Sequence, residues 1–244
     1  MRAVATAYSD RVATVLLVRH ARSSANSGGV LAGRSAGVLL DEAGVNQARD
    51  TAARLAPLPL VAVVSSPLER CRQTAEAVLE AHPSVTTIQI DDRLTECGYG
   101  DWTGRELKHL AKEKLWAVVQ SHPSAAVFPG GEALRDVQAR GVAAVRDWDV
   151  AITDEHGPAA LWVAVSHGDV IKAILADALG THLDNFQRIV VDPASVSAVS
   201  YTRLRPFVVR YNEHGDLSGL APAKKRRRRR AASSDAAVGG GAGT

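Results

Sequence analysis

The stretch LLVRHARSSAN, residues 16–26, places an arginine and a histidine directly after an apolar run. The run at 14–18 is typical of a buried strand, and a strand tip is a rigid place from which Arg19 and His20 can meet a ligand or cap the next element. Three more hydrogen-bonding side chains follow closely: Arg22, Ser23 and Asn26. What this polar tip does depends on what the rest of the chain brings beside it.

The body of the chain alternates strand-like and helix-like segments. Apolar runs and further strand candidates follow at 60–65, 86–90, 161–165, 195–202 and 206–211. Amphipathic stretches that favour helices lie between them, at 42–55, 67–81, 103–120, 132–151 and 168–180. Short apolar strands that alternate with such helices indicate a mostly parallel sheet with both faces covered. We therefore predict an α/β fold, a three-layer α/β/α sandwich around a mostly parallel central sheet.

Polar side chains follow four of the predicted strands, at the carboxyl ends where open sheets of this kind bind ligands. They are Arg19 and His20 after the first strand, Arg70 after the second, Glu96 after the third and His167 after the fourth. After the second strand we expect Ser65 or Ser66 to cap a helix that has Pro67 in its first turn. The convergence of two arginines, two histidines and a glutamate predicts a single site.

This set of side chains fits phosphoryl transfer. Arginine forks match phosphate oxygens with paired hydrogen bonds, and a helix N-terminus, here at Gly168, adds free N–H groups. A histidine can attack phosphorus and form a covalent intermediate, and a glutamic acid of raised pKa can protonate the leaving alkoxide. No carboxylate cluster suited to magnesium is present, so we expect no metal and no cofactor, with the arginines supplying the positive charge.

The opening motif resembles that of the histidine phosphatase superfamily, branch 1, also called phosphoglycerate mutase-like. Later segments resemble its later motifs in the same order: SSPLERCRQTAE, LTECGYGDWTG, FPGGEALRDVQAR and VAVSHGDVIKAIL. The resemblance implies the phosphoglycerate mutase-like fold and an enzyme of the phosphatase type. It also implies that His20 is the phosphorylated nucleophile and Glu96 the proton donor, with the phosphate held by Arg19, Asn26, Arg70 and His167.

Two positions depart from the family pattern. Ala21 stands where a glycine is frequent, a harmless change, and Arg22 stands where glutamate, glutamine or another polar residue is frequent. Arg22 leaves the core chemistry alone and favours a more anionic substrate, so we take Arg22 and Ser23 as candidate substrate contacts. Ser23 and Asn26 also have a simpler interpretation, as caps of the loop.

Three functions compete at this point. A phosphomonoester hydrolase acting on a small phosphorylated metabolite ranks first. A phosphoglycerate mutase would use the same residues, but members of that group resemble one another in a longer and more basic insertion than the segment 97–130 provides. The third alternative, from another class, is a non-catalytic module that docks on a polyanion, and it would require a damaged site. The sequence does not identify the substrate.

The charge of the chain is unevenly distributed. The net charge is +3. The segment 224–244 holds seven cations and one anion, which leaves residues 1–223 at −3. We predict an N-terminal extension at 1–13, a phosphatase domain at 14–220 and a disordered basic tail at 221–244. The tail is either a solvated segment or a weak, salt-sensitive contact for polyanions.

Other features of the sequence bear on the cellular location of the protein and on the roles of its remaining residues. No apolar stretch is long enough to span a bilayer and no export signal is recognisable, so we expect no membrane contact and a cytoplasmic protein. Cys71 and Cys97 are too few for a disulfide framework. Trp102 is the tryptophan most suited to line a substrate site. A homodimer would be ordinary for such a protein. We interpret the remaining histidines as structural: His82, His109, His122, His156, His182 and His214.

Overall fold

A six-stranded sheet in the order β3-β2-β4-β1-β5-β6 organises the molecule. The computed structural model describes residues 11–202 and 204–221. The strands are β1 (Arg11–Arg19), β2 (Leu60–Ser65), β3 (Ile88–Ile90), β4 (Leu161–Ser166), β5 (Val196–Thr202) and β6 (Phe207–Glu213). The first four run parallel, whereas β5 is antiparallel to β1 and β6 is antiparallel to β5. The predicted mostly parallel sheet is confirmed.

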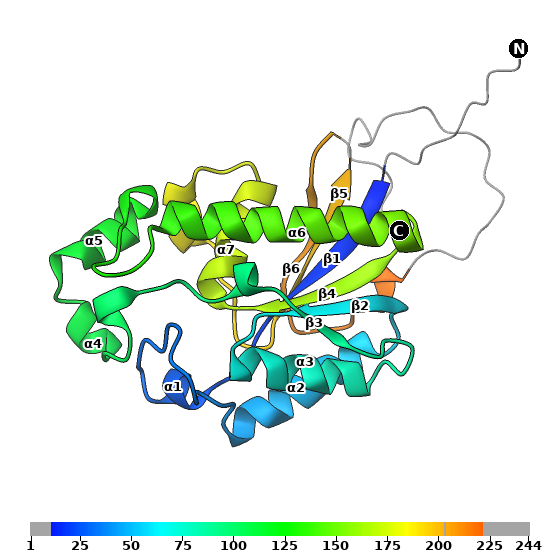
Figure 1. The fold of residues 1–244 in the computed structure, drawn as a ribbon, viewed down its shortest axis with the longest axis horizontal. Helices are drawn as coiled ribbons and strands as arrows, with labels where there is room; N and C mark the ends of the chain where they lie inside the picture. The colour runs from blue at the N-terminus through cyan, green and yellow to red at the C-terminus, as the bar shows by residue number, and fades with distance from the viewer. Residues whose placement is uncertain (1–10, 203, 222–244) are drawn as a thin grey trace, which may run out of the picture.

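Helices cover both faces of the sheet, which confirms the three-layer prediction. They are α1 (Ser24–Ser27), α2 (Glu42–Leu55), α3 (Glu69–Glu80), α4 (Leu107–Leu110), α5 (Lys114–Ser121), α6 (Leu134–His156) and α7 (Gly168–Ala178). Figure 1 shows α6 and α7 on one side of the sheet and α2 and α3 on the other. Short 3-10 turns complete the connections, at Asp92–Leu94, Gly100–Trp102, Pro123–Ala125, Leu183–Arg188 and Ser218–Leu220.

Strand β1 shows how the apolar runs build the core. Successive side chains of a strand point to opposite faces. Val15 and Leu17 belong to the core cluster on the α6 and α7 face, and Leu16 and Val18 belong to the cluster on the α2 and α3 face. All of them are buried, and each such burial stabilises the fold by about 1.5–3 kcal/mol. A continuous apolar run is therefore what a strand covered on both faces requires.

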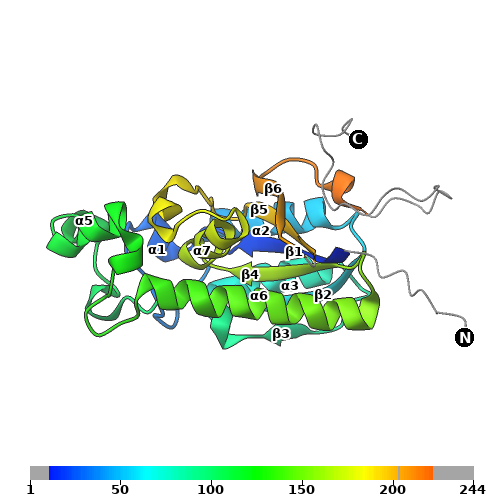
Figure 2. The same cartoon turned by 90° about the horizontal axis from the view of Figure 1, so that it is seen from above.

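The strand pairing aligns the polar tips along one edge. Arg19 at the end of β1 pairs with Ser166 at the end of β4, and Ser65 at the end of β2 pairs with Ile90 at the end of β3. The four parallel strands thus deliver their following residues to the same end of the molecule. Figures 1 and 2 show α1 and α5 lying at that end, beyond the sheet.

The predicted helix at 103–120 is wrong as a single element. Gly104 has a φ of 80°, and Glu106 forms an isolated antiparallel bridge with Val30. This bridge holds residues before α4 in an extended conformation, so the helical pattern starts only at Leu107. Helix α4 then ends, and α5 begins at Lys114 with Glu113 as its N-cap. Two short helices replace one long helix and form the outer wall of the site.

The predicted cap of α3 is also wrong. The N-cap is Leu68, which makes no side-chain capping bond. The Ser65 hydroxyl donates to the Ser66 carbonyl, and the Ser66 hydroxyl is 2.8 Å from Nε2 of His167. Ser66 therefore binds the histidine that follows β4, and its hydroxyl reaches the helix only through a long contact of 3.4 Å from the N–H of Leu68.

The described elements begin and end as follows. Strand β1 begins at Arg11, before the predicted start at residue 14. The last turn ends at Leu220. The predicted basic tail and most of the predicted N-terminal extension lie outside the described residues. Across residues 11–202 and 204–221, no helix has the length and apolarity to cross a membrane.

Asp149 on α6 gives the fold a pH dependence that can be measured. Its Oδ1 accepts a hydrogen bond from Nε1 of Trp162 at 3.1 Å, and its Oδ2 is buried without a partner. Burial raises the pKa of Asp149 to about 7, and the bond from Trp162 opposes that rise. Because the folded-state pKa lies above the unfolded one, this group contributes stability at acidic pH that is lost as the pH rises through about 7.

Asp149→Asn should therefore reduce the loss of stability between pH 5 and pH 8. We expect the melting temperature of the variant to exceed that of the wild type at pH 8 by roughly 5 °C, and the difference to shrink at pH 5. Asp154→Asn, at an exposed position of the same helix, is the matched control. If the melting temperatures of Asp149→Asn and the wild type differ by the same amount at pH 5 and pH 8, Asp149 is not the source of the pH dependence.

Candidate functional site

A pocket of about 270 Å³ lies where the parallel strands end. Its polar floor includes the predicted residues Arg19, His20, Asn26, Arg70 and Glu96. Its wall is largely apolar and includes Leu31, Tyr99, Trp102, Trp116, Val119 and Phe128. The structure thus joins most of the sequence-predicted set in one cavity.

Arg70 is the centre of the polar floor. It lies in the first turn of α3 and is 1% exposed, yet no carboxylate within residues 11–202 and 204–221 forms an ion pair with it. Its Nε donates to Nε2 of His20 at 3.2 Å. Its Nη2 donates to the Gly33 carbonyl at 2.8 Å and lies 3.2 Å from Nδ1 of His167. Its Nη1 is buried without a partner, so a fixed positive charge is left open to an anion.

His20 is held in one tautomer. Its Nδ1 lies 2.8 Å from the Ala21 carbonyl, which can only accept, so Nδ1 carries the proton. The other nitrogen, Nε2, accepts from Arg70 and therefore presents a lone pair. Burial, together with the charges of Arg70 and Arg19, lowers the pKa of His20 well below its usual value. The result is a neutral imidazole whose unprotonated Nε2 is directed at Arg70.

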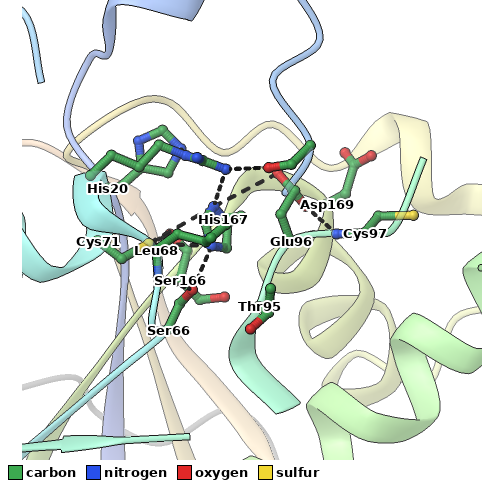
Figure 3. Close-up of polar contacts among 12 residues, drawn as sticks. His20, Ser66, Leu68, Cys71, Thr95, Glu96, Cys97, Ser166, His167 and Asp169 are labelled. Carbon is green, nitrogen blue, oxygen red and sulfur yellow. Dashed lines mark hydrogen bonds and ion pairs between the residues drawn. The ribbon is translucent and has the colours of Figure 1, made fainter. Parts of the chain in front are cut away.

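His167 is buried beneath Arg70 and does not itself line the pocket. Because Arg70 can only donate, Nδ1 of His167 accepts, and Nε2 donates to the Ser66 hydroxyl. In Figure 3, His167 lies between Ser66 and Glu96, and its Nδ1 is 3.9 Å from Oε2 of Glu96. Burial and the charge of Arg70 lower the pKa of His167 as well. Both histidines are therefore neutral beside two arginines.

Arg19 supplies a second cation from the tip of β1. Its Nη1 donates to the Val191 carbonyl at 2.6 Å, while its Nε is buried without a partner. A Cβ at Gly168 would lie 3.4 Å from Cζ of Arg19, so glycine at the start of α7 lets the backbone approach the guanidinium. The N-terminus of α7 adds positive potential at the same place.

Glu96 is a buried carboxyl at the edge of this cationic centre. It is 9% exposed, and its Oε1 accepts from the N–H of Cys97 at 2.9 Å. Burial raises the pKa of Glu96 to about 7, and the negative charge of Asp169 adds to the rise while Arg70 opposes it. A carboxyl with this pKa is partly protonated near neutral pH, as a proton donor requires.

The thiols beside the site are inert. Cys71 Sγ lies 3.4 Å from Nε2 of His167, and Cys97 follows Glu96. Burial raises the pKa of both thiols, so neither is a ready thiolate.

Asn26, Ser23 and Arg22 differ in their positions. Asn26 and Ser23 line the pocket and form a capping box at the start of α1, in which the Asn26 Oδ1 accepts from Ser23 N and Oγ. Arg22 lies outside the pocket lining, and its Nε donates to Asp41 at 2.8 Å. The structure does not bring Arg22 to the site, because its guanidinium is held by the residue that caps α2.

A partly buried ion cluster that the sequence interpretation missed fixes the segment around Glu96. Arg140 of α6 donates to the backbone carbonyls of Arg93, Thr95 and Glu96. Glu132 accepts from Arg140 at 2.9 Å and from the N–H of Gly98 at 2.8 Å. The FPGGE stretch contains Glu132, but nothing in its spacing to Arg140 or Glu96 signals that the three meet.

Asp169 and its partners were also missed. Oδ2 of Asp169 accepts from the Tyr99 hydroxyl at 2.7 Å, and Oδ1 lies 4.0 Å from Nζ of Lys172. In the sequence Asp169 lies two residues after His167, a position that a helix N-terminus alone would explain. Its hydrogen bond with Tyr99, seventy positions away in the sequence, becomes visible only in the folded structure.

Arg140→Ala should loosen the segment that carries Glu96. It removes hydrogen bonds from a charged donor to three carbonyls and to Glu132, so we expect the free energy of unfolding to fall by about 2 kcal/mol. Hydrogen exchange at residues 93–98 should also accelerate. Arg135→Ala, on the same helix with a side chain that is 66% exposed, is the matched control and should change stability by less than about 0.5 kcal/mol. Equal effects of the two changes would refute this role of Arg140.

Comparison with known proteins identifies the family. Residues 15–214 match the family model of the histidine phosphatase superfamily (branch 1). Phosphoserine phosphatase 1 of Hydrogenobacter thermophilus is 30% identical over 206 residues, which cover 81% of this chain and 91% of that protein. Glucosyl-3-phosphoglycerate phosphatase of Mycolicibacterium vanbaalenii is 32% identical over 184 residues, 72% of this chain and 78% of that protein.

A solved structure agrees with these relatives. The mycobacterial glucosyl-3-phosphoglycerate phosphatase in complex with VO3 superposes with a TM-score of 0.73 at 27% identity, over 82% of this chain and 98% of that chain. The resemblance first seen in the motifs is thereby confirmed, as is the expectation of a phosphatase-type enzyme. The chain belongs to the histidine phosphatase superfamily, branch 1.

Proposed function

We propose that this enzyme hydrolyses phosphomonoesters through a phosphohistidine formed on His20. The observation that carries the proposal is the buried guanidinium of Arg70. Among the described residues it has no carboxylate partner, its Nη1 is unpaired, and its Nε donates to Nε2 of a neutral His20. A phosphate dianion would supply the missing partner for Arg70 and for Nε of Arg19. The relative solved with VO3 supports an anion in such a site.

In the first step, the Nε2 lone pair of His20 attacks phosphorus and the ester P–O bond breaks. The leaving oxygen takes the proton of the Glu96 carboxyl and departs as an alcohol. Arg70 and Arg19 bind the phosphoryl oxygens and stabilise the charge that develops on them. The ring centroid of His167 lies 5.2 Å from that of His20, and His167 orients Arg70 by accepting a hydrogen bond from its Nη2.

In the second step, the Glu96 carboxylate takes a proton from water. The water oxygen attacks phosphorus, the N–P bond breaks, and inorganic phosphate leaves. His20 returns to the neutral form with its proton on Nδ1, and Glu96 regains the proton that it donated. The same carboxyl thus acts as acid and then as base, for which a pKa of about 7 is well placed.

The two arginines provide the charge that a metal ion provides in other phosphatases, so the proposed hydrolysis is independent of metals. A mutase would instead retain the phosphoryl group on His20 and pass it to a second acceptor. The short α4 and α5 wall replaces the longer basic insertion typical of mutases, which favours transfer to water.

A panel of primary-alkyl and aryl phosphomonoesters tests the proposal directly. The wild type should hydrolyse several of them, and saturating EDTA should leave the rate within about twofold. His20→Ala should remove turnover and keep the melting temperature. The wild-type enzyme should interconvert 2- and 3-phosphoglycerate at a negligible rate, even when primed with 2,3-bisphosphoglycerate. Loss of activity in EDTA that magnesium restores, or efficient interconversion without phosphate release, would overturn the proposal.

Glu96 should set the alkaline limb of the pH profile. Since the protonated form is the acid, kcat on an alkyl phosphate should fall as the pH rises through about 7. Glu96→Gln should lose roughly 10²-fold on the alkyl phosphate and far less on p-nitrophenyl phosphate, whose leaving group needs no proton.

Glu80→Gln is the matched control, because Glu80 is exposed at the end of α3. This variant should keep the wild-type rate and the fall of kcat as the pH rises through about 7. If Glu96→Gln loses the same factor on both substrates, Glu96 is not the proton donor.

A further inference from the structure

The pocket extends beyond the phosphate centre, which is formed by Arg19, His20 and Arg70, into a region that would meet the alcohol portion of the substrate. The role of this region rests on the proposed function. Its wall is a rigid aromatic cluster. The rings of Trp102 and Trp116 are stacked with centroids 6.2 Å apart, and Phe128 lies edge-on to Trp102 at 5.3 Å and to Tyr99 at 5.0 Å. Trp102, Tyr99 and Phe128 are each buried, so the packing fixes the wall before any ligand binds.

This outer region offers no free positive charge. Among the described residues that line the pocket, Lys172 is the cation outside the phosphate centre. Its Nζ lies 4.0 Å from Oδ1 of Asp169, donates to Oε1 of Gln187 at 3.2 Å and lies 4.9 Å from the centroid of the Phe186 ring. Lys172 and Asp169 both line the pocket, so this part of the wall pairs one cation with one anion, and a second anionic group on a substrate would face Asp169 as well as Lys172.

The nearby arginines cannot supply the missing charge. Arg22 and Arg34 lie outside the pocket lining. Arg22 is held by Asp41, and Arg34 donates to Glu132 at 2.7 Å. A carboxylate or second phosphate moved from water to this wall would lose hydration without gaining an ion pair. The amide of Gln187 is engaged by Lys172 and by the Val119 carbonyl. The exposed amide of Gln120 in the lining can meet the alcohol, and it suits an uncharged hydrogen-bonding group.

From this geometry we infer that the substrate is the monophosphate of an uncharged alcohol that carries a planar or apolar group. A flat group can lie against the rings of Trp102 and Trp116 while the phosphate binds at Arg70 and His20. The volume of about 270 Å³ restricts that group to a small ring system. Phosphoserine and glucosyl-3-phosphoglycerate, the compounds in the names of two relatives, both carry a carboxylate, so this chain should discriminate against them.

Two substrates that differ at one end test the inference. 3-Phenylpropyl phosphate and 4-(phosphonooxy)butanoate are both primary-alkyl monophosphates, one ending in a ring and the other in a carboxylate. We expect kcat/KM to be at least about tenfold higher for the ring. Propyl phosphate, which lacks either group, reports whether the proposed chemistry occurs at all.

Two variants place the preference in the pocket. Trp116→Ala should lower the ratio of kcat/KM between the ring and carboxylate substrates by about tenfold, because it removes half of the stacked pair. Gln120→Lys, at an exposed position of α5 in the lining, should raise kcat/KM for the carboxylate substrate several-fold. Leu179→Ala is the matched control, since Leu179 is 54% exposed and lies outside this pocket, and it should leave the ratio unchanged.

The outcomes separate the inference from the proposed function. If propyl phosphate is hydrolysed and the carboxylate substrate matches or exceeds the ring substrate, the inference is overturned while the proposed function stands. An unchanged ratio in Trp116→Ala, with the melting temperature preserved, would also overturn it. If none of the three esters is hydrolysed, the proposed function fails and the inference fails with it.

Discussion

The buried guanidinium of Arg70 is the constraint on which the rest of the site depends. A charge without a counter-ion in a dry interior is costly, and the fold offsets that cost with fixed acceptors: the Gly33 carbonyl and the ring nitrogens of His20 and His167. These acceptors work only if both imidazoles are neutral. Together with burial, the arginine keeps both imidazoles neutral, and it also contributes to the charge that the pocket presents to a ligand.

Burial acts in opposite directions on the two kinds of titratable group here. It lowers the pKa of His20 and His167 and raises the pKa of Glu96, because in each case the neutral form is the less costly one. Burial in one pocket thus favours neutral His20 and raises the pKa of Glu96, which is the combination that the proposed mechanism requires. The parallel sheet makes this arrangement feasible, since it brings the residues that follow β1, β2, β3 and β4 to one edge.

The sequence predicted the residues that lie at strand tips, because the apolar runs locate the tips and the topology of a parallel sheet brings them together. Arg19, His20, Arg70 and Glu96 were all predicted on this basis, and all line the pocket. The contacts of Glu132 and Arg140 could not be predicted, because they join a loop to a helix and no periodic pattern in the sequence relates the two segments. The break between α4 and α5 depends on the bridge between Val30 and Glu106, a pairing that local propensity does not encode. Arg22 has the right sequence position but is held by Asp41, which only the fold reveals.

The measurement that tests the account most directly is the location of the phosphoryl group during a single turnover. The wild-type enzyme would be mixed with an excess of alkyl phosphate, quenched in alkali within the first turnover, digested and analysed by mass spectrometry. The account predicts an acid-labile phosphoryl group on His20 that appears with the released alcohol and before inorganic phosphate. A phosphoryl group on another side chain, or release of the alcohol in step with phosphate from a protein that never carries one, would contradict it.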